Sequence, residues 1–315
     1  MARKRARRAV PSNAGRTRRG GSRRSRPSPS SWGTWHPLAS GFHFGTKDIA
    51  WADREESEAI AASDTARARI APPPPPFKPL RGRGVPLPSP TPNDAFTKVL
   101  LERRTWRGFG KTAVPLSKLG TLLRLTFGVQ MEGRTAAGAH VLFKTSPSGG
   151  ARHPIEAYVL ALRVSGLPRG LYHFGPDTGR LHRVRRGASP AQLVEYLSGQ
   201  WWFADAAALV LMTAVLPRVR WRYPHPRAYR SVLLGAGHLC QTFCLVATWL
   251  KLAPFCTQAL ADSRIEGDLG VDGVDEVVVY AAGVGSRPRD GRWVQWPPHR
   301  PGQPFFPPDF TKKRR

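Results

Sequence analysis

In the middle of the chain, stretches whose apolar residues recur with helical spacing are mixed with short continuous apolar runs. Between residues 94 and 128, apolar residues recur with helical spacing, which predicts two amphipathic helices, "DAFTKVLLERR" and "PLSKLGTLLRLTFG". We expect Thr91 to cap the first helix, with Asp94 at its third position, and Ser117 to cap the second. The apolar side of the second helix is expected to comprise Leu119, Leu122, Leu123 and Leu125.

A series of short strands follows these helices. The runs "IEAYVLALRV", "LYHF" and "RLHRVR" are separated by the turns "GLPRG" and "GPDTG", which predicts an antiparallel meander. The sequence then predicts a short helix capped by Ser189, a buried strand over 206–216, a long apolar helix over about 230–250 and a last strand, "DEVVVYAAGVG". This mixture of hairpins and helices favours an α+β or mixed α/β fold over a sandwich or a helical bundle.

Composition divides the chain into a folded centre and two loose ends. Prolines crowd before residue 93 and after residue 296, as is typical of segments that build no core. We therefore expect four parts: a disordered basic leader (1–40), an N-terminal extension with a Pro-rich linker (41–93), one folded domain (94–296) and a Pro-rich basic tail (297–315).

The net charge of +28 lies largely at those ends. Eleven Lys and Arg residues within residues 1–30, together with the final "KKRR", supply 15 of these charges. Basic tails bind polyanions without sequence preference. We therefore expect at most non-specific nucleic-acid binding through the tails, and a solvated or non-native leader is the alternative.

Cysteine usage and hydropathy suggest the compartment. The three cysteines are odd in number and lie in apolar surroundings, which suggests a reducing compartment. No apolar segment follows the basic start, and the run "AAALVLMTAVL" is too short to span a bilayer. We expect a cytoplasmic protein without membrane contact. Since His238, Cys240 and Cys244 have offsets that do not share one helical face, we expect no metal site.

Three stretches carry candidate chemistry. "ERRTWRGF" contains Arg103, Arg104, Thr105 and Arg107, which suit a phosphate or merely end a helix. "SPSGGARHP" could bring backbone N–H groups close to a flat or anionic ligand, or could be an ordinary turn. "RWRYPHPRAYR" (220–230) could bind a polyanion or form one wall of an active site. The P-loop, dinucleotide and GxSxG templates each fail at a required position.

The order of these motifs resembles one enzyme family. "ERRTWRGF", "SPSGGARHPIEAYVLAL", "GLYHF", "RWRYPHPRAYRSVLLGAGHLCQTF", "LAPF" and "YAAGVG" together are similar to SagB-type dehydrogenases, over roughly residues 94–290. These belong to the nitroreductase-like, FMN-dependent superfamily and mature peptides that carry thiazole and oxazole rings. "FHFGTKD" also resembles a subgroup of peptide-maturation dehydrogenases.

The resemblance implies an α+β fold with a central, mostly antiparallel sheet flanked by helices, in a homodimer with FMN at the subunit interface. It implies a peptide substrate and a cyclodehydratase partner. The FMN-binding residues that it implies are Arg103, Arg104 and Thr105 with the adjacent Arg107, the loop residues Ser146, Pro147, Ser148 and Gly149, and Arg287 after the last strand.

The catalytic pair departs from the family pattern. The family places a Lys-Tyr pair in the motif that here reads "RWRYPHPRAYR", so Tyr223 keeps the tyrosine and Arg222 replaces the lysine. An arginine side chain does not deprotonate inside a protein, whereas a buried lysine can. Arg222 could anchor an anion or support Tyr223 as the base. Alternatively, the enzyme could act on another redox substrate, such as a nitro compound, a quinone or a differently modified peptide.

Overall fold

The computed structural model describes residues 35–48, 94–135, 138 and 140–290, together with the isolated positions 75, 78 and 87. The expected tail and most of the expected leader and linker lie outside these residues, as does Thr91.

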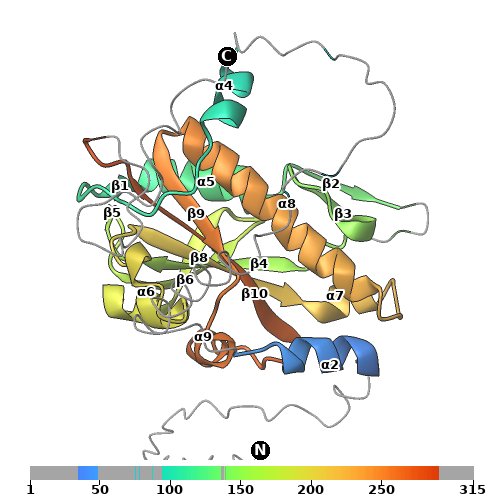
Figure 1. Ribbon diagram of the computed structural model, residues 1–315. Coiled ribbons are helices and arrows are strands. Elements are labelled where there is room, and N and C mark those ends of the chain that lie inside the picture. The colour runs from blue at the N-terminus through green and yellow to red at the C-terminus, as the bar shows by residue number, and fades with distance from the viewer. Residues whose placement is uncertain are drawn as a thin grey trace, which may run out of the picture.

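A six-stranded sheet forms the centre of the fold, and every neighbouring pair of strands in it is antiparallel. In spatial order its strands are β7 (Arg180–Arg186), β6 (Gly170–Gly175), β4 (Ile155–Ala161), β8 (Ala208–Val215), β10 (Glu276–Ser286) and β9 (Leu252–Thr257). The predicted meander is confirmed as β4, β6 and β7. The arrangement of this sheet with flanking helices confirms the α+β class (Figure 1).

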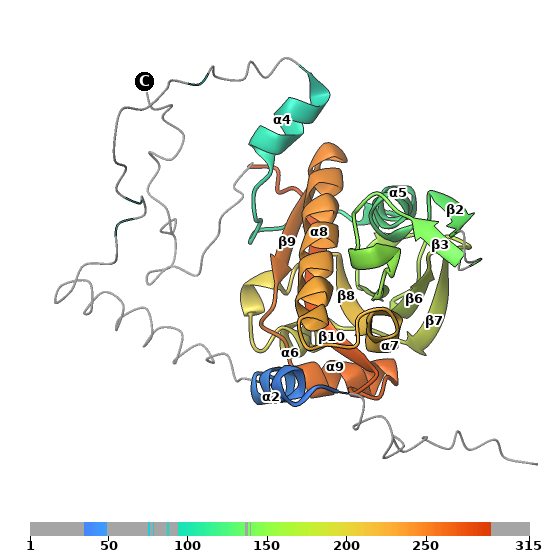
Figure 2. The ribbon, with the colours of Figure 1, turned by 90° about the vertical axis from the view of Figure 1, so that its right-hand side faces the viewer.

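Helices cover both faces of this sheet (Figures 1 and 2). The helices α5 (Leu116–Phe127) and α8 (Ala228–Trp249) pack on one face, and α6 (Pro190–Tyr196) and α9 (Asp262–Leu269) pack on the other. Strand β4 is buried along its whole length because its alternate residues enter the two cores. Val159, for example, joins the core under α8, whereas Leu160 joins the core under α6.

The remaining described elements are short. They are α2 (Pro37–Gly45), α4 (Ala95–Glu102), β1 (Val114–Pro115), β2 (Met131–Arg134), β3 (His140–Phe143), the 3-10 turn η1 (Gly149–Ala151), β5 (Val164–Ser165), the 3-10 turn η2 (Trp201–Phe203) and α7 (Leu216–Arg220). The sequence patterns did not predict the β2–β3 hairpin or α9.

The first two helices of the domain begin differently from the prediction. Asp94 is itself the N-cap of α4, and its Oδ1 accepts a 2.8 Å hydrogen bond from the Thr97 N–H. The predicted cap at Ser117 is wrong, because α5 already begins after Pro115 without a side-chain cap. Leu125 is 37% exposed and so does not join the buried side of α5. Ser189 caps α6 as predicted, through the Gln192 N–H.

Helix α2 lies outside the predicted domain boundaries (94–296), yet it packs against the folded domain. Helix α2 straddles the expected boundary at Ser40 and lies beside α9 (Figure 2). The Trp35 indole Nε1 donates a 3.0 Å hydrogen bond to the Val274 carbonyl. Lys47 forms an ion pair with the buried Glu266. These contacts place part of the expected leader and extension against the folded core.

In the described part of the chain, α8 is long and apolar enough to cross a bilayer, judged by length and composition alone. Half of its apolar window is buried inside the fold, as in the core helix of a globular domain.

We predict opposite effects for two glycine-to-alanine substitutions. A Cβ on Gly283, in the buried strand β10, would lie 2.3 Å from the Phe255 ring, so Gly283→Ala should lower the free energy of unfolding by about 1–3 kcal/mol or more through overpacking. Gly120, within α5, has open space around its Cα. Gly120→Ala should therefore raise stability by about 0.5–1 kcal/mol. Urea denaturation followed by circular dichroism measures both, and equal effects would contradict the packing described.

Candidate functional site

The Arg-rich stretch 220–230 forms the corner between α7 and α8. The backbone N–H of Tyr223 bonds the Val219 carbonyl at 2.9 Å, and the His225 N–H bonds the Tyr223 carbonyl at 2.9 Å. Two tight turns therefore hold Tyr223 after the end of β8 and before the first turn of α8. Arg220 pairs with Asp275, which directs this cation toward the domain and not toward a polyanion.

The Gly-rich loop lies directly against this corner. Gly150 has φ of +59°, and a Cβ at this position would lie 2.7 Å from Tyr223 Oη and 2.8 Å from Arg222 Cδ. Only glycine allows the loop backbone to approach the pair this closely. The structure thus brings together two motifs that the sequence analysis singled out separately.

Arg222 and Tyr223 also contact one another. Arg222 Nε donates a 3.3 Å hydrogen bond to Tyr223 Oη, and the guanidinium carbon lies 5.6 Å from the centre of the phenol ring. The cation can therefore stabilise negative charge that develops on the phenol oxygen. Arg152 extends the contact between loop and corner, because it bonds the Gly150 carbonyl and lies over the Trp221 ring.

The loop backbone is strained next to the pair. Ala151 and His153 both have positive φ, 50° and 42°, which costs about 1–3 kcal/mol per residue. Hydrogen bonds hold the strained conformation: the His153 N–H donates to Ser148 Oγ at 3.0 Å, and the His153 ring bonds the Leu142 carbonyl at 2.9 Å. Such strain concentrates at functional sites.

Two further loop residues are fixed on α8. Ser146 Oγ bonds Thr242 Oγ1 at 2.7 Å, and His238 Nδ1 bonds the Pro147 carbonyl at 3.3 Å. His238 therefore positions the loop. The predicted loop residues Ser146, Pro147, Ser148 and Gly149 consequently lie along the middle of α8.

A charged cluster beneath the loop was missed by the sequence analysis. Buried Glu156 accepts from Arg218 and, at 2.9 Å, from His173. Burial opposes its charge, yet these two partners hold the pKa of Glu156 below its ordinary value. Lys144 lies near both Glu156 and Arg218, and burial lowers its pKa. The sequence does contain one sign of this cluster: Glu156 is the single acidic residue within the apolar strand "IEAYVLAL".

The predicted arginine segment lies elsewhere, by α4 and the C-terminal part of α8. Arg287 Nη2 donates to the Thr248 carbonyl at 3.2 Å, and its guanidinium stacks 5.3 Å from the Trp106 ring centre. Arg104 Nη1 bonds the Leu101 carbonyl at 2.7 Å, at the end of α4. Thr105 and Arg107 are half-buried, and burial lowers the pKa of Arg107.

The two predicted halves of the cofactor site therefore lie along different stretches of α8. The loop contacts the helix from Ser231 to Thr242, and the arginine segment contacts it near Thr248 (Figure 1).

A cavity of about 430 Å³ opens on the other side of Tyr223. Aromatic and proline residues from the segment just before α2 and from α7, the corner and the start of α8 line it, including Trp35, Pro217, Trp221, Tyr223, Pro224 and Tyr229. The wall is stabilised by a 2.7 Å hydrogen bond between His43 Nδ1 and Tyr229 Oη. Burial, with the nearby charge of Lys47, lowers the pKa of His43 to about 4, so this ring is neutral near pH 7.

Comparison with known proteins agrees with this fold. The model of the nitroreductase family matches residues 100–286. A protein of Methanocaldococcus jannaschii that is named as a nitroreductase is 29% identical over 167 residues, which cover 53% of this chain and 80% of that protein. The trifolitoxin-processing protein TfxB of Rhizobium leguminosarum bv. trifolii is 31% identical over 141 residues, 44% of this chain.

This match spans 38% of TfxB, so the chain corresponds to well under half of that relative. Among solved structures, a chain from the E. coli microcin synthetase McbBCD complex with truncated pro-MccB17 bound has a TM-score of 0.60. The superposition covers 82% of this chain and 96% of that chain at 18% identity, which shows a shared fold.

We predict that His43 makes the stability of the docked helix depend on pH. The unfolded chain binds the imidazole proton near pH 6.5 and the folded chain only near pH 4. The free energy of unfolding should therefore fall as the pH falls from 6.5 to 4, by up to about 3 kcal/mol from this residue.

Urea denaturation at a series of pH values measures this dependence. The control is His43→Gln, which keeps a polar partner for Tyr229 but does not titrate, so the other histidines contribute equally to both proteins. Parallel pH profiles for wild type and variant would rule out this role of His43.

Proposed function

Since the chain belongs to the nitroreductase family, we propose that it is an FMN-dependent oxidoreductase that dehydrogenates azoline rings to azoles in a ribosomally made peptide. The observation that carries this proposal is the packing of the Gly-rich loop on the Arg222–Tyr223 pair. In this packing, the Tyr223 hydroxyl oxygen, which could accept a proton, and the Arg222 cation lie beside the loop that is expected to flank the flavin. The similarity to a trifolitoxin-processing protein supports a peptide as substrate.

The residues present suit FMN. Guanidinium groups match a phosphate well, and those of Arg103, Arg104 and Arg287, with the Thr105 hydroxyl and the adjacent Arg107, would hold the phosphate and the ribityl chain. Arg287 is already oriented by the carbonyls of Thr248 and Leu252. The loop Ser146–Gly149 would lie beside the ring. When bound, FMN would supply the acceptor for the hydride equivalent that leaves the azoline.

The chain itself would handle the proton. Aromatising an azoline removes a proton from the carbon next to the one that loses hydride, and a base must stand close to it. Tyr223 Oη would accept this proton, while Arg222, which donates to the same oxygen, would stabilise its developing charge. Arg222 thus serves as the charge partner of the base and not as the base.

Exposed apolar side chains support a homodimer. Leu234 on α8 is 63% exposed, and Leu233, Trp249 and, on α4, Leu101 are also exposed. Large apolar side chains exposed on neighbouring helices are typical of an interaction surface. A second copy packed on α8 would cover this face and would bring the loop of one protomer toward the arginine segment of its partner.

The aromatic cavity next to Tyr223 would admit the substrate peptide, and a cyclodehydratase that makes the azoline would be the partner enzyme. The microcin synthetase complex, which shares this fold in one chain, supports such an assembly. The second candidate is a flavoenzyme of the same fold with another redox substrate, and the substitution at Arg222 is the observation that favours it.

We predict that Tyr223 is required for azoline oxidation. With FMN and an azoline-containing peptide, the wild type should remove two hydrogens per ring, measured by mass spectrometry. Tyr223→Phe should reduce the rate by about 100-fold or more, the usual contribution of a positioned base. Arg222→Lys should retain the activity or raise it, because lysine keeps the cation and can also accept a proton.

Arg227→Lys is the matched control, since it makes the same exchange in the same corner and should leave the rate unchanged. A Tyr223→Phe variant within a few-fold of wild type would show that Tyr223 is not the base, and Lys144 would become the candidate. A flavin-loaded wild type that reduces quinones or nitro compounds but leaves azolines intact would favour the second candidate function.

We predict that the α8 face forms the subunit interface. Leu234→Glu should convert the dimer to a monomer, because it places a charge in a desolvated apolar contact, and bound flavin should be lost with it. Light scattering after size-exclusion chromatography and the flavin absorbance measure these effects. Val184→Glu on β7, 42% exposed in the wild type, should remain a flavin-containing dimer. A dimeric, yellow Leu234→Glu protein would exclude this face.

A further inference from the structure

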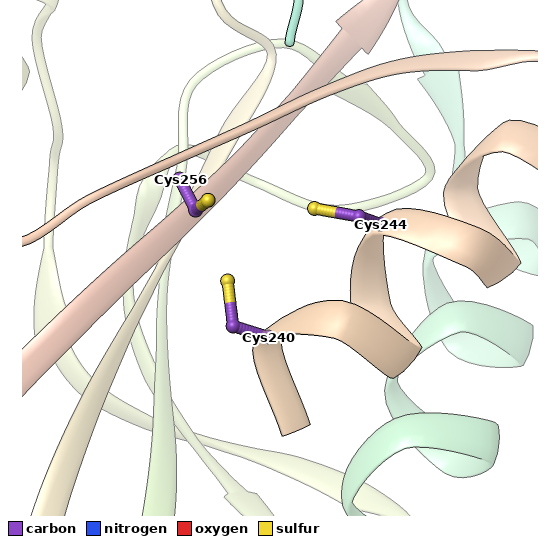
Figure 3. A group of neighbouring side chains, drawn as sticks. All are labelled: Cys240, Cys244 and Cys256. Atoms are coloured by element: carbon purple, nitrogen blue, oxygen red, sulfur yellow. The ribbon is translucent and has the colours of Figure 1, made fainter. Parts of the chain in front are cut away.

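Three cysteine side chains meet between α8 and the sheet, although they come from two elements. Cys240 and Cys244 lie on α8 and Cys256 lies on β9. Their sulfur atoms all lie within 4.8 Å of one another. Figure 3 shows the three thiols pointing into one shared space.

The backbone explains this convergence. Residues four apart on a helix share one face, so Cys240 and Cys244 both point toward the sheet. Strand β9 pairs with β10 beneath this part of the helix, with Cys256 opposite Ala282. Cys240 and Cys244 are buried, whereas Cys256 is partly exposed and leaves a path from solvent. The three ligand positions are therefore held by rigid elements.

We infer that Cys240, Cys244 and Cys256 form a binding site for one thiophilic d10 metal ion, Zn²⁺ or Cu⁺. Thiolates select these ions. Metal–sulfur bonds of about 2.3 Å place coordinating sulfurs about 4 Å apart. Small side-chain rotations would therefore bring the observed sulfurs to bonding distance.

Charge balance supports the site. Binding of Zn²⁺ by three thiols releases three protons and leaves a complex of net charge −1. The Arg103 guanidinium lies close enough to act electrostatically on both Cys244 and Cys256, so it would offset this charge in a partly buried setting. Tyr280 also lies close enough to interact electrostatically with Cys240 and Cys256.

The spacing of His238, Cys240 and Cys244 along one helix could not reveal this site. His238 bonds the Gly-rich loop instead, and the third ligand comes from a strand. A bound ion would join α8 to β9 next to Arg103, and it would do so whether or not the protein oxidises azolines.

The full chain is suited to a direct test because it contains only these three cysteines. Reduced, metal-free protein would be titrated anaerobically with Co²⁺ as a spectroscopic probe for the zinc geometry. We expect one ion per chain, intense sulfur-to-cobalt charge-transfer absorption and displacement by Zn²⁺. A parallel titration with Cu⁺ against a chromophoric chelator shows which of the two ions binds more tightly.

Cys256→Ser should weaken binding by at least about 100-fold, since even the loss of a group that only supports a metal ligand costs 10–100-fold. Thr257→Ser, the next residue on β9, keeps all three thiols and should bind like the wild type. Bound metal should also slow the reaction of the three thiols with a disulfide reagent.

Failure of the wild type to bind either Co²⁺ or Cu⁺ saturably, at one ion per chain, would overturn the proposal without any variant. Equal binding by a Cys256→Ser protein with an unchanged circular dichroism spectrum would overturn it as well. Both readouts are independent of flavin and of azoline oxidation, so they separate this proposal from the proposed function.

Discussion

The packing of α8 across the sheet is the contact on which the other features depend. Its inner face buries Ala236, Phe243 and Ala247 against the core, and burial of this kind supplies the main favourable term in folding. Three candidate functional segments then attach to different parts of the same helix: the Gly-rich loop at its middle, the arginine segment near its end and the corner of residues 220–230 at its start. Rigidity of α8 therefore determines how accurately these segments are placed relative to one another.

Much of the fold could be predicted because local patterns determine it. The meander, the long helix and the last strand follow from runs of apolar residues and from turn residues adjacent in sequence. Errors arose where tertiary packing overrode a local rule. Leu125 has helical spacing from its buried neighbours, but the sheet covers only part of the helix circumference. Helix α5 begins directly after Pro115 and has no side-chain cap, so Ser117 lies within its first turn instead of capping it.

The candidate site could be predicted only as separate pieces. Arg222 and Tyr223 are adjacent in sequence, so their pairing was accessible, whereas the approach of Gly150 to them depends on the tertiary fold. The Glu156 cluster and the convergence of Cys256 with two helix cysteines join segments far apart along the chain, and periodicity within one element carries no information about such contacts. The docking of α2 was missed because composition marked its surroundings as low-complexity.

The edge strand β7 has a consequence for how copies of this chain can associate. Its sequence, "RLHRVRR", places four exposed arginines on the strand at one edge of the sheet that the described strands form. An unprotected edge strand invites backbone pairing with a second molecule, and closely spaced cations oppose that pairing because like charges would face each other. The strand therefore acts as a barrier to sheet-to-sheet polymerisation.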